Sequence, residues 1–166
     1  MTPEFSRPVT VARIASPGDR HDLRADAAEC AAVAARLGVP AVQALTCALR
    51  LRAESAGVVL AEGTLHARLT QVCVVSTEEF DADLREDFAV RFVPEGTEHV
   101  EFDPDSLDEI PYAGGSIDLG ELAVEQVALA LDPYPRKPGV EIGPLEEDEE
   151  AAASPFAALA RRQAKD

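Results

Sequence analysis

The side chains that most often perform chemistry are scarce in this chain and widely spaced. The chain has 3 histidines and 3 cysteines, and none has a second histidine, cysteine or carboxylate at the spacing of a metal-ligand set. These residues are His21, His66, His99, Cys30, Cys47 and Cys73. We therefore expect no metal and no cofactor. The cysteines are interpreted as small core residues of a protein from a reducing compartment.

Carboxylates and short motifs offer no catalytic constellation either. Asp81 and Asp83 resemble an acid–base pair, but they lie in a Glu-rich stretch that we interpret as an exposed turn without apolar neighbours to raise a pKa. The chain has no G-x-G-x-x-G, P-loop, G-x-S-x-G or H-E-x-x-H motif. The stretch "AGGSID" precedes a predicted helix and could receive an anion, yet Asp118 brings a negative charge there, which favours a tight turn. We expect no catalytic residue and no enzyme.

Net charge is the strongest feature of the composition, at −16 over 166 residues. Residues 76–109 hold thirteen acids against Arg85 and Arg91, and residues 141–150 hold six more. An acidic surface repels phosphate, so DNA is not an expected partner, and it attracts a basic protein. The same charge also fits a well-solvated surface without a binding role.

A small basic stripe runs against this acidity. Arg50 and Arg52 alternate on one predicted strand, and His66 and Arg68 alternate on the next. If the two strands pair as a hairpin, the four side chains share one face and can meet RNA phosphates. They can equally pair with the acids of the neighbouring turn, and the sequence leaves both interpretations open.

The hydrophobic pattern predicts a single α+β domain over residues 1–139. Two-residue alternation favours an antiparallel sheet with strands in residues 7–14, 47–54, 58–76 and 87–93. Gly63 inside the third of these strands suggests a bulge or bend. With no apolar run long enough to cross a bilayer, we expect a soluble, cytoplasmic protein without a membrane partner.

Two helices complete the predicted domain. The first covers residues 26–38, with a capping box between Asp26 and Glu29, and a short helical turn follows in residues 40–45. The second begins at Asp118, where Glu121 would complete a second capping box, and ends before Pro133. Its predicted inner face is Leu119, Leu122, Gln126, Val127, Ala130 and Leu131.

The rest of the chain is predicted to lie outside the domain. Residues 140–153 are too acidic and too poor in large apolar side chains to fold, so we expect a disordered linker. Residues 154–166 are expected to form a short terminal helix that Ser154 caps, with Pro155 in its first turn and Phe156 on its apolar face.

Three segments, in order, resemble the YceD family of large ribosomal RNA subunit accumulation proteins. They are "GTLHARLTQVCVVS", "DEIPYAGGSIDLGELAVEQVALALDPYPRKPG" and "SPFAALARR", which together span residues 63–162. The resemblance implies a role in the synthesis, processing or stability of large-subunit (23S) ribosomal RNA, without a known catalytic activity. The family-like positions are Cys73, Glu109, Asp118, Leu119, Glu125, Gln126, Leu129, Pro133, Pro155 and Phe156.

We interpret Leu119 and Leu129 as core residues and Asp118 as a helix cap. The interaction candidates that the resemblance implies are Glu109, Asp118, Glu125, Gln126, Pro155 and Phe156. Many relatives carry paired cysteines that resemble a four-cysteine zinc site, whereas here Cys73 stands alone and "PYPRKPG" has no cysteine, so zinc is not expected.

These observations lead to one principal hypothesis and two alternatives. The chain is expected to be a non-enzymatic ribosome-biogenesis factor whose acidic residues 76–109 engage a basic ribosomal or rRNA-processing protein, with the Phe156 helix as a tethered docking peptide. The first alternative is direct RNA binding through Arg50, Arg52, His66 and Arg68. The second is an acidic mimic of nucleic acid.

Overall fold

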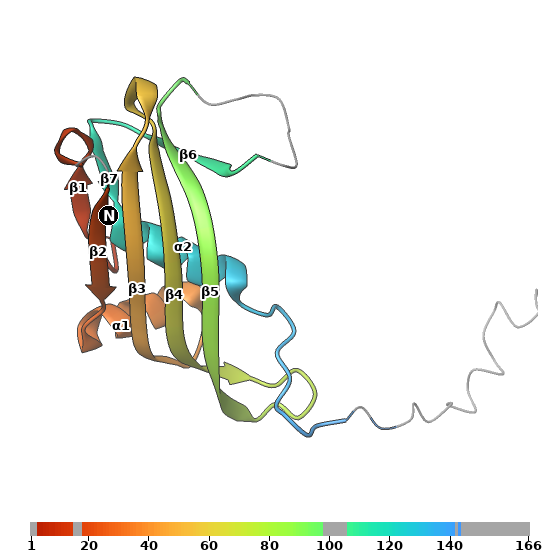
Figure 1. Cartoon of the computed structure of the whole chain (residues 1–166). Helices are drawn as coiled ribbons and strands as arrows, with labels where there is room; N and C mark the ends of the chain where they lie inside the picture. Colours follow the sequence, from red (N-terminus) through yellow and green to blue (C-terminus); the bar gives the residue numbers. More distant parts are fainter. Residues whose placement is uncertain (1–2, 15–17, 98–105, 142, 144–166) are drawn as a thin grey trace, which may run out of the picture.

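A five-stranded sheet forms the centre of the computed structural model, which describes residues 3–14, 18–97, 106–141 and 143 (Figure 1). The strand order is β2-β3-β4-β5-β6, antiparallel except that β6 runs parallel to β5. The strands are β2 (Asp19–Arg24), β3 (Ala41–Ala53), β4 (Val59–Val72), β5 (Glu79–Pro94) and β6 (Asp108–Tyr112). The predicted single α+β domain with a mainly antiparallel sheet is confirmed.

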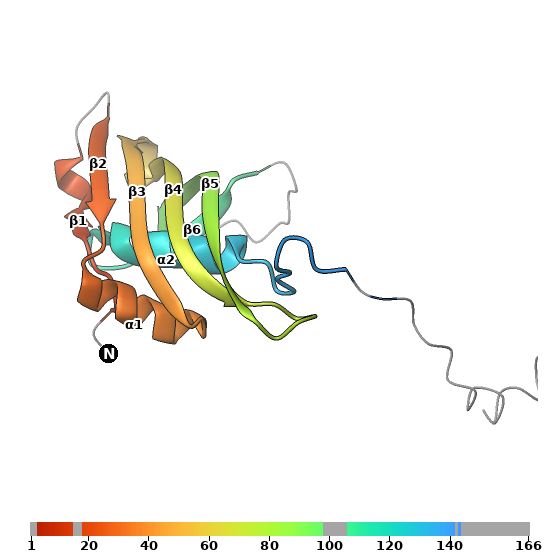
Figure 2. The same ribbon diagram turned by 90° about the horizontal axis from the view of Figure 1, so that it is seen from below.

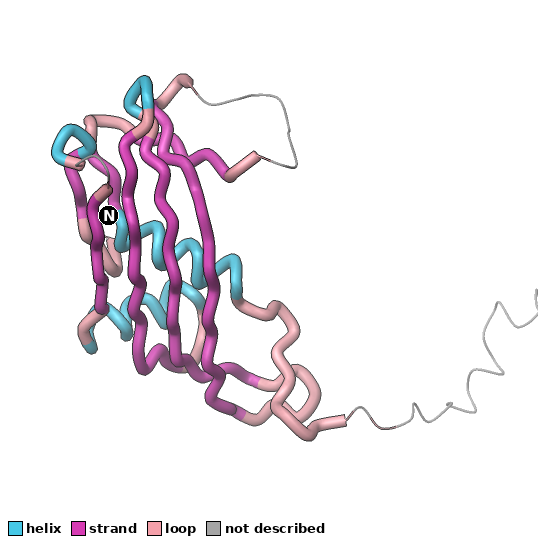
Figure 3. Tube along the Cα trace, in the orientation of Figure 1, coloured by secondary structure: helices cyan, strands magenta, loops and turns pink. Residues whose placement is uncertain are grey.

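Both helices lie on one face of this sheet. In Figure 1, α1 (Ala27–Leu37) and α2 (Leu119–Ala130) pass behind the strands, and the front face carries no other described element. A two-stranded sheet of β1 (Pro8–Thr10) and β7 (Ser116–Asp118) lies beside β2, and short 3-10 turns cover Val11–Arg13 and Ser55–Gly57 (Figures 2 and 3). The molecule therefore has two layers, the sheet and the helices, and the other face of the sheet carries no described helix.

The core fills the space between the sheet and the helices. On β3, Leu45, Leu49 and Leu51 alternate toward the helices and are at most 1% exposed. Leu65 and Leu69, on the same face of β4, are buried as well. The helix side chains that pack against this face are also buried, among them Val33, Leu119, Leu122 and Val127. Each such large apolar side chain contributes about 1.5–3 kcal/mol on burial, so this layer supplies most of the stability.

The predicted helix caps are only partly confirmed. The Asp26 carboxylate accepts from Glu29 N at 2.8 Å and the Glu29 carboxylate accepts from Asp26 N at 2.8 Å, which completes the first capping box. Asp118 caps α2 through Gly120 N and Glu121 N, but no second capping box forms. The Glu121 carboxylate instead binds Arg36 on α1, because a charged partner is worth more to it than the neutral backbone amide.

Two local predictions are wrong, and one strand was not predicted. Residues 40–45, expected to be a helical turn, begin β3, since their pairing with β4 outweighs the local preference. The stretch around Asp81 and Asp83, expected to be an exposed turn, belongs to β5, because it continues the hairpin with β4. Strand β2 (Asp19–Arg24) was not predicted, since four of its six side chains are charged.

Gly63 is required by close packing and not by a bulge. The strand register passes through Gly63 without a shift, and the irregularity lies between Val42 and Ala44. A Cβ at Gly63 would stand 2.7 Å from Leu49 Cδ2 and 2.8 Å from Phe88 Cζ. The glycine thus lets these two large side chains meet above β4.

Gly120 gives a direct test of how α2 meets the N-terminal segment. A Cβ there would lie 2.5 Å from the Phe5 carbonyl oxygen, which is backbone and cannot rotate away. Alanine usually stabilises a helix by up to about 1 kcal/mol over glycine, yet we expect Gly120→Ala to destabilise by about 1–3 kcal/mol through overpacking. Urea unfolding measures this, with exposed Ala128→Gly as the control for helix propensity. A more stable Gly120→Ala variant would contradict the packing.

Candidate functional site

The open face of the sheet collects the arginines of the chain. Strand register places seven of the 15 lysines and arginines there. We call this surface the arginine face; its cations are Arg20, Arg24, Arg50, Arg52, Arg68, Arg85 and Arg91, together with His66. It includes all four residues of the predicted basic stripe, so the structure brings Arg50, Arg52, His66 and Arg68 together on one face as expected.

The cations form rows across the strands. One row runs Arg24–Thr46–His66–Arg85 over four strands. Two rows further along the strands, Arg20 on β2 lies directly opposite Arg50 on β3. Like charges directly opposite each other on neighbouring strands destabilise a sheet. Arg20 and Arg50 form such a pair, and Glu62 lies opposite Arg50 on its other side, so this row carries two cations against one carboxylate.

Acids on the same face neutralise only some of these charges. Its six carboxylates are Asp22, Glu62, Glu79, Asp81, Asp83 and Asp87. Arg68 pairs with Asp81 at 3.5 Å, and Arg52 and Arg91 both pair with Glu54 at the end of β3, at 3.8 and 3.4 Å. Within the described part of the chain, no ion pair is recorded for Arg20, Arg24, Arg50 or Arg85.

A shallow hollow of about 560 Å³ opens in the middle of the arginine face. Its floor is low because Ala48 and Ala89 have small side chains, and Arg20 and Arg50 stand on its wall with Glu62 and Asp87. No Phe, Tyr or Trp side chain faces outward from β2, β3, β4 or β5. Phe88 also lines the hollow, but the register places its side chain on the helix face beside Gly63. The hollow can thus hold a charged, hydrogen-bonding group and has no outward-facing aromatic side chain for stacking a base.

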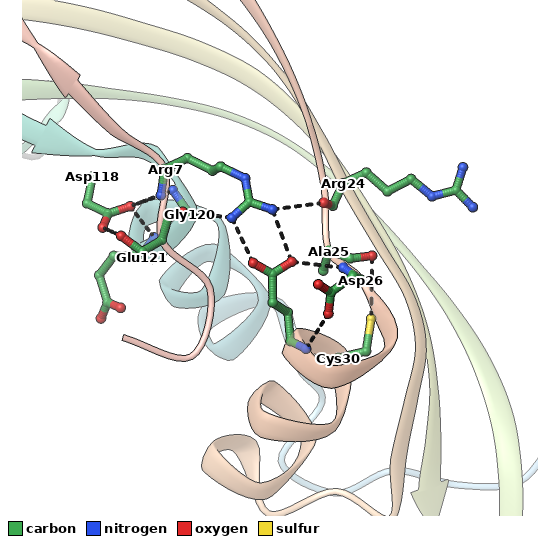
Figure 4. Close-up of polar contacts among 10 residues, drawn as sticks. Arg7, Arg24, Ala25, Asp26, Cys30, Asp118, Gly120 and Glu121 are labelled. Carbon is green, nitrogen blue, oxygen red and sulfur yellow. Dashed lines mark hydrogen bonds and ion pairs between the residues drawn. The ribbon is translucent and has the colours of Figure 1, made fainter. Parts of the chain in front are cut away.

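A second polar cluster, centred on Asp118, lies at the N-terminus of α2 (Figure 4). The Asp118 carboxylate accepts from Gly120 N at 2.9 Å, from Glu121 N at 3.2 Å and from Arg7 N at 2.7 Å, and it also accepts from the Ser6 hydroxyl. Burial alone would raise the pKa of Asp118, but these donors outweigh it and hold the pKa below its usual value. Asp118 is a structural cap whose recorded contacts all lie within the domain.

Two arginines extend this cluster to α1. Arg7 binds the Glu29 carboxylate with both guanidinium nitrogens, at 2.7 and 3.0 Å, and lies 4.6 Å over the Phe5 ring. Arg36 binds Glu121 at 2.6 Å and Glu4 at 3.0 Å, which raises its pKa and ties α1, α2 and the N-terminal segment together. These bidentate pairs fix the orientation of both helices.

The other family-like residues do not form a site together. Glu109 lies on β6 beside Arg91 in the strand register, Glu125 is exposed on α2 and Gln126 is half-buried. Partial desolvation raises the pKa of Glu125, with Glu121 adding to the effect and Arg36 opposing it. Pro155 and Phe156, with the predicted terminal helix, lie outside the described residues.

The interpretation of Leu129 as a core residue is wrong. Leu119 is fully buried, but Leu129 is 76% exposed, because the inner face of α2 is formed by residues that include Ala123 and Val124. The helical period counted from Val127 therefore turns Leu129 outward. Sequence alone missed this because Leu129, Ala130 and Leu131 form a continuous apolar run without a polar residue to mark the outer side.

Cys73 forms the third polar arrangement, at the turn between β4 and β5. Its side chain is fully enclosed, and Ser76 N lies 3.4 Å from Sγ. The Ser76 side chain and the backbone N–H groups of Ser76 and Lys137 lower the pKa of this thiol to about 6. The same turn is tied to the segment after α2 by Val74 N donating to Pro135 O at 2.9 Å and by Lys137 binding Glu78 at 2.9 Å.

These residues do not fit a zinc site. Ser76 stands three residues after Cys73, where a second thiolate would be needed, and backbone N–H groups already point at the sulfur. In the described ranges as a whole, no group of three His, Cys, Asp or Glu side chains is arranged to hold a metal ion. Cys30 and Cys47 are buried hydrophobic residues as predicted, and burial raises the pKa of the Cys47 thiol to about 12.

The Asp118 cluster predicts a specific pH dependence of folding. Because the folded-state pKa of Asp118 is depressed, its contribution is complete above the unfolded-state pKa of about 3.9 and is lost as the pH falls through the folded value. Asp118→Asn keeps the cap, so we expect the variant to lose less stability than the wild type between pH 5 and 2. Asp118→Ala should cost about 1–2 kcal/mol at pH 7 as well. Urea unfolding across pH tests both, and parallel pH profiles for wild type and Asp118→Asn would refute the assignment.

Cys73 predicts a second pH effect, in a different range. Its folded-state pKa of about 6 lies below that of an unfolded cysteine, so its stabilisation is complete above about pH 8.5 and is lost as the pH falls through 6. Thiolate absorbance at 240 nm should therefore show one step near pH 6 in the folded protein, absent from Cys73→Ala. Cys47→Ala is the matched control and should retain the step. A folded wild type without thiolate absorbance at pH 8 would contradict the geometry.

Comparisons with known proteins agree with the resemblance seen in the sequence. Among the described residues, no helix is long and apolar enough to cross a membrane. Searches of curated proteins and of solved structures returned no match. The family model described as large ribosomal RNA subunit accumulation protein YceD matches residues 61–161, which include most of β4 and all of β5, β6, β7 and α2. The chain therefore belongs to the YceD family of large ribosomal RNA subunit accumulation proteins.

Proposed function

We propose that the chain promotes accumulation of large-subunit ribosomal RNA by binding the RNA directly with its arginine face and without catalysing a reaction. The observation that supports this most is the gathering of seven arginines on the one sheet face that no described helix covers. Each guanidinium carries a permanent charge and a planar set of donors that matches a phosphate. Release of counterions from the RNA then supplies the binding free energy.

The overall acidity of the chain gives this contact a direction. With a net charge of −16, the chain as a whole repels phosphate, and the arginine face gathers seven of its 15 lysines and arginines on one described surface. A bound RNA is thus held in one orientation relative to the sheet. Ion pairs on the face, such as Arg68 with Asp81, keep the attraction moderate, which suits a factor that must leave the finished subunit.

The lack of outward Phe, Tyr and Trp side chains on these strands indicates which form of RNA fits. Single strands are usually bound by stacking bases on aromatic rings. The arginine face offers mainly charged and hydrogen-bonding groups around the hollow above Ala48 and Ala89. Backbone phosphates and ribose hydroxyls of a folded or double-helical segment are the groups that match it.

A second candidate function is docking of a basic ribosomal or rRNA-processing protein on the acidic surface. The observation in its favour is strand β5, whose first half carries Glu79, Asp81, Asp83, Glu86 and Asp87 against Arg85 alone. Asp81, Asp83 and Asp87 lie on the arginine face beside Arg68 and Arg85, so a basic protein bound at β5 and an RNA bound across the arginines would be neighbours on one face of the sheet.

The RNA interaction is tested with the four arginines that have no recorded ion pair. We expect Arg20→Gln/Arg24→Gln/Arg50→Gln/Arg85→Gln to weaken binding to folded large-subunit rRNA fragments at least tenfold in low salt. The slope of log K against log salt should fall by about 0.7–0.9 for each phosphate that the variant no longer neutralises. Filter binding or fluorescence anisotropy across a salt series measures both.

The matched control is Arg13→Gln/Arg136→Gln, which removes exposed cations away from the arginine face. It should bind as the wild type does after correction for net charge. Because the control removes two charges and the test variant four, the losses of affinity are compared per charge removed. Equal losses per charge would mean that binding follows total charge and that the arginine face does not touch the RNA. Unchanged urea unfolding in both variants shows that the fold is intact.

A further inference from the structure

Strand β5 has a long edge that no described strand covers. Strand β6 pairs only with Val90–Pro94 at the end of β5, so residues 79–89 have β4 on one side and no strand on the other among the described residues. In Figures 1 and 3, β6 leaves the lower part of β5 open. An open edge presents alternate unpaired N–H and C=O groups, which are a template for one more strand.

The side chains along this edge are charged on one face of the sheet. Glu79, Asp81, Asp83 and Asp87 belong to the open face, whereas Glu86 lies opposite Leu65 on the helix face. Charged residues on an edge deter pairing with other copies of the same chain, because like charges would meet. The same charges favour an incoming strand that carries lysines or arginines on the corresponding face.

On the helix face, rows of apolar side chains run across β3 and β4 and end at β5, where the side chains are less buried. In the row Leu45–Ala67–Leu84, the first two residues are 0% and 2% exposed, whereas Leu84 is only half-buried. In the row Val42–Leu69–Ala82, the first two are 8% and 1% exposed, and Ala82 is again half-buried. An apolar side chain from a further strand would complete both rows.

Helix α2 offers a neighbouring apolar contact. Its C-terminal end passes behind β5 and emerges beyond the open edge in Figures 1 and 2. Leu129, at this end of α2, is 76% exposed. A strand added to β5 would have the end of α2 on its helix side and open solvent on the other.

We propose that an extended segment of a second protein, with basic and apolar residues in alternation, adds to residues 79–89 of β5 as a sixth strand of the sheet. Its backbone pairs with the open edge, its basic side chains meet Asp81, Asp83 and Asp87, and its apolar side chains cover Ala82 and Leu84. The proposal rests on the second candidate function above, and it specifies the partner as an extended basic peptide and not a folded basic surface.

The first experiment uses the full chain and a synthetic peptide of four Lys-Val repeats, labelled with a fluorophore. Two analogues carry N-methyl groups on every lysine nitrogen or on every valine nitrogen of the backbone, which removes one set of N–H donors at unchanged charge. In an added strand only one of these sets faces β5, because N–H direction alternates with side-chain direction. We expect one analogue to bind at least tenfold more weakly and the other to bind nearly as well as the parent. Equal affinities for all three, or no binding by the parent at low salt, would overturn the proposal.

The second experiment places the peptide on the edge. Asp83→Lys/Asp87→Lys should weaken peptide binding at least tenfold, whereas Asp22→Lys/Glu95→Lys makes the same change in net charge away from the edge and should weaken it much less. Equal losses of affinity would show an effect of total charge and contradict the proposal. These measurements contain no RNA, so their failure leaves direct RNA binding by the arginine face intact.

Amide hydrogen exchange distinguishes a second protein from a segment of the same chain. In the free full-length chain, the outward-facing amides of residues 79–89 should exchange rapidly, and the Lys-Val peptide should protect them. Protection of the same amides before any peptide is added would show that the edge is already occupied by this chain, which would overturn the proposal.

Discussion

The carboxylate of Asp118 is the interaction on which the arrangement of the molecule depends. It caps α2 and at the same time binds Ser6 and Arg7, so one group joins the N-terminal segment to the helix that covers the sheet. Gly120 allows the Phe5 carbonyl to lie directly on the first turn of α2. Arg7 and Arg36 then carry the connection to α1. With both helices and both chain segments held on one side, the opposite face of the sheet carries no described helix or strand.

That face is where, under the proposed function, an acidic protein contacts RNA. Net charge alone argues against nucleic acid, and the sequence made a basic protein partner the leading expectation. Strand pairing changes the conclusion, because it assembles arginines that are far apart in the chain, from Arg20 to Arg91. The relevant quantity is the local charge of one surface and not the sum over the chain.

Sequence predicted the elements that rest on local signals. Asp26, Glu29 and Gly38 define α1 by neighbouring residues alone, and the alternation of Leu49, Leu51, Leu65 and Leu69 defines the buried face of β3 and β4. It also predicted that Arg50, Arg52, His66 and Arg68 share a face, since two strands and a turn at Gly57 were enough. The family assignment came from the motifs around Cys73 and Asp118.

What the sequence could not provide depends on contacts between distant segments. Arg20, Arg24 and Arg85 belong to the arginine face because β2 and the first half of β5 are strands. These two segments are rich in charged residues, so the sequence pattern did not identify them as strands. The second capping box gave way to Arg36, a residue 85 positions away from Glu121. Leu129 was placed in the core because an apolar run does not show which of its residues faces outward. Each difference arose where tertiary pairing outweighed a local pattern.

Crosslinking of the bound RNA tests the central claim most directly. Zero-length ultraviolet crosslinking of the full chain to large-subunit precursor rRNA, followed by mass spectrometry of the crosslinked peptides, identifies the residues that touch the RNA. The account predicts crosslinks in β2, β3, β4 and β5 at positions facing the open side, including the neighbourhoods of Arg50, His66 and Arg85. Crosslinks confined to α1, α2 or residues 144–166 would contradict it.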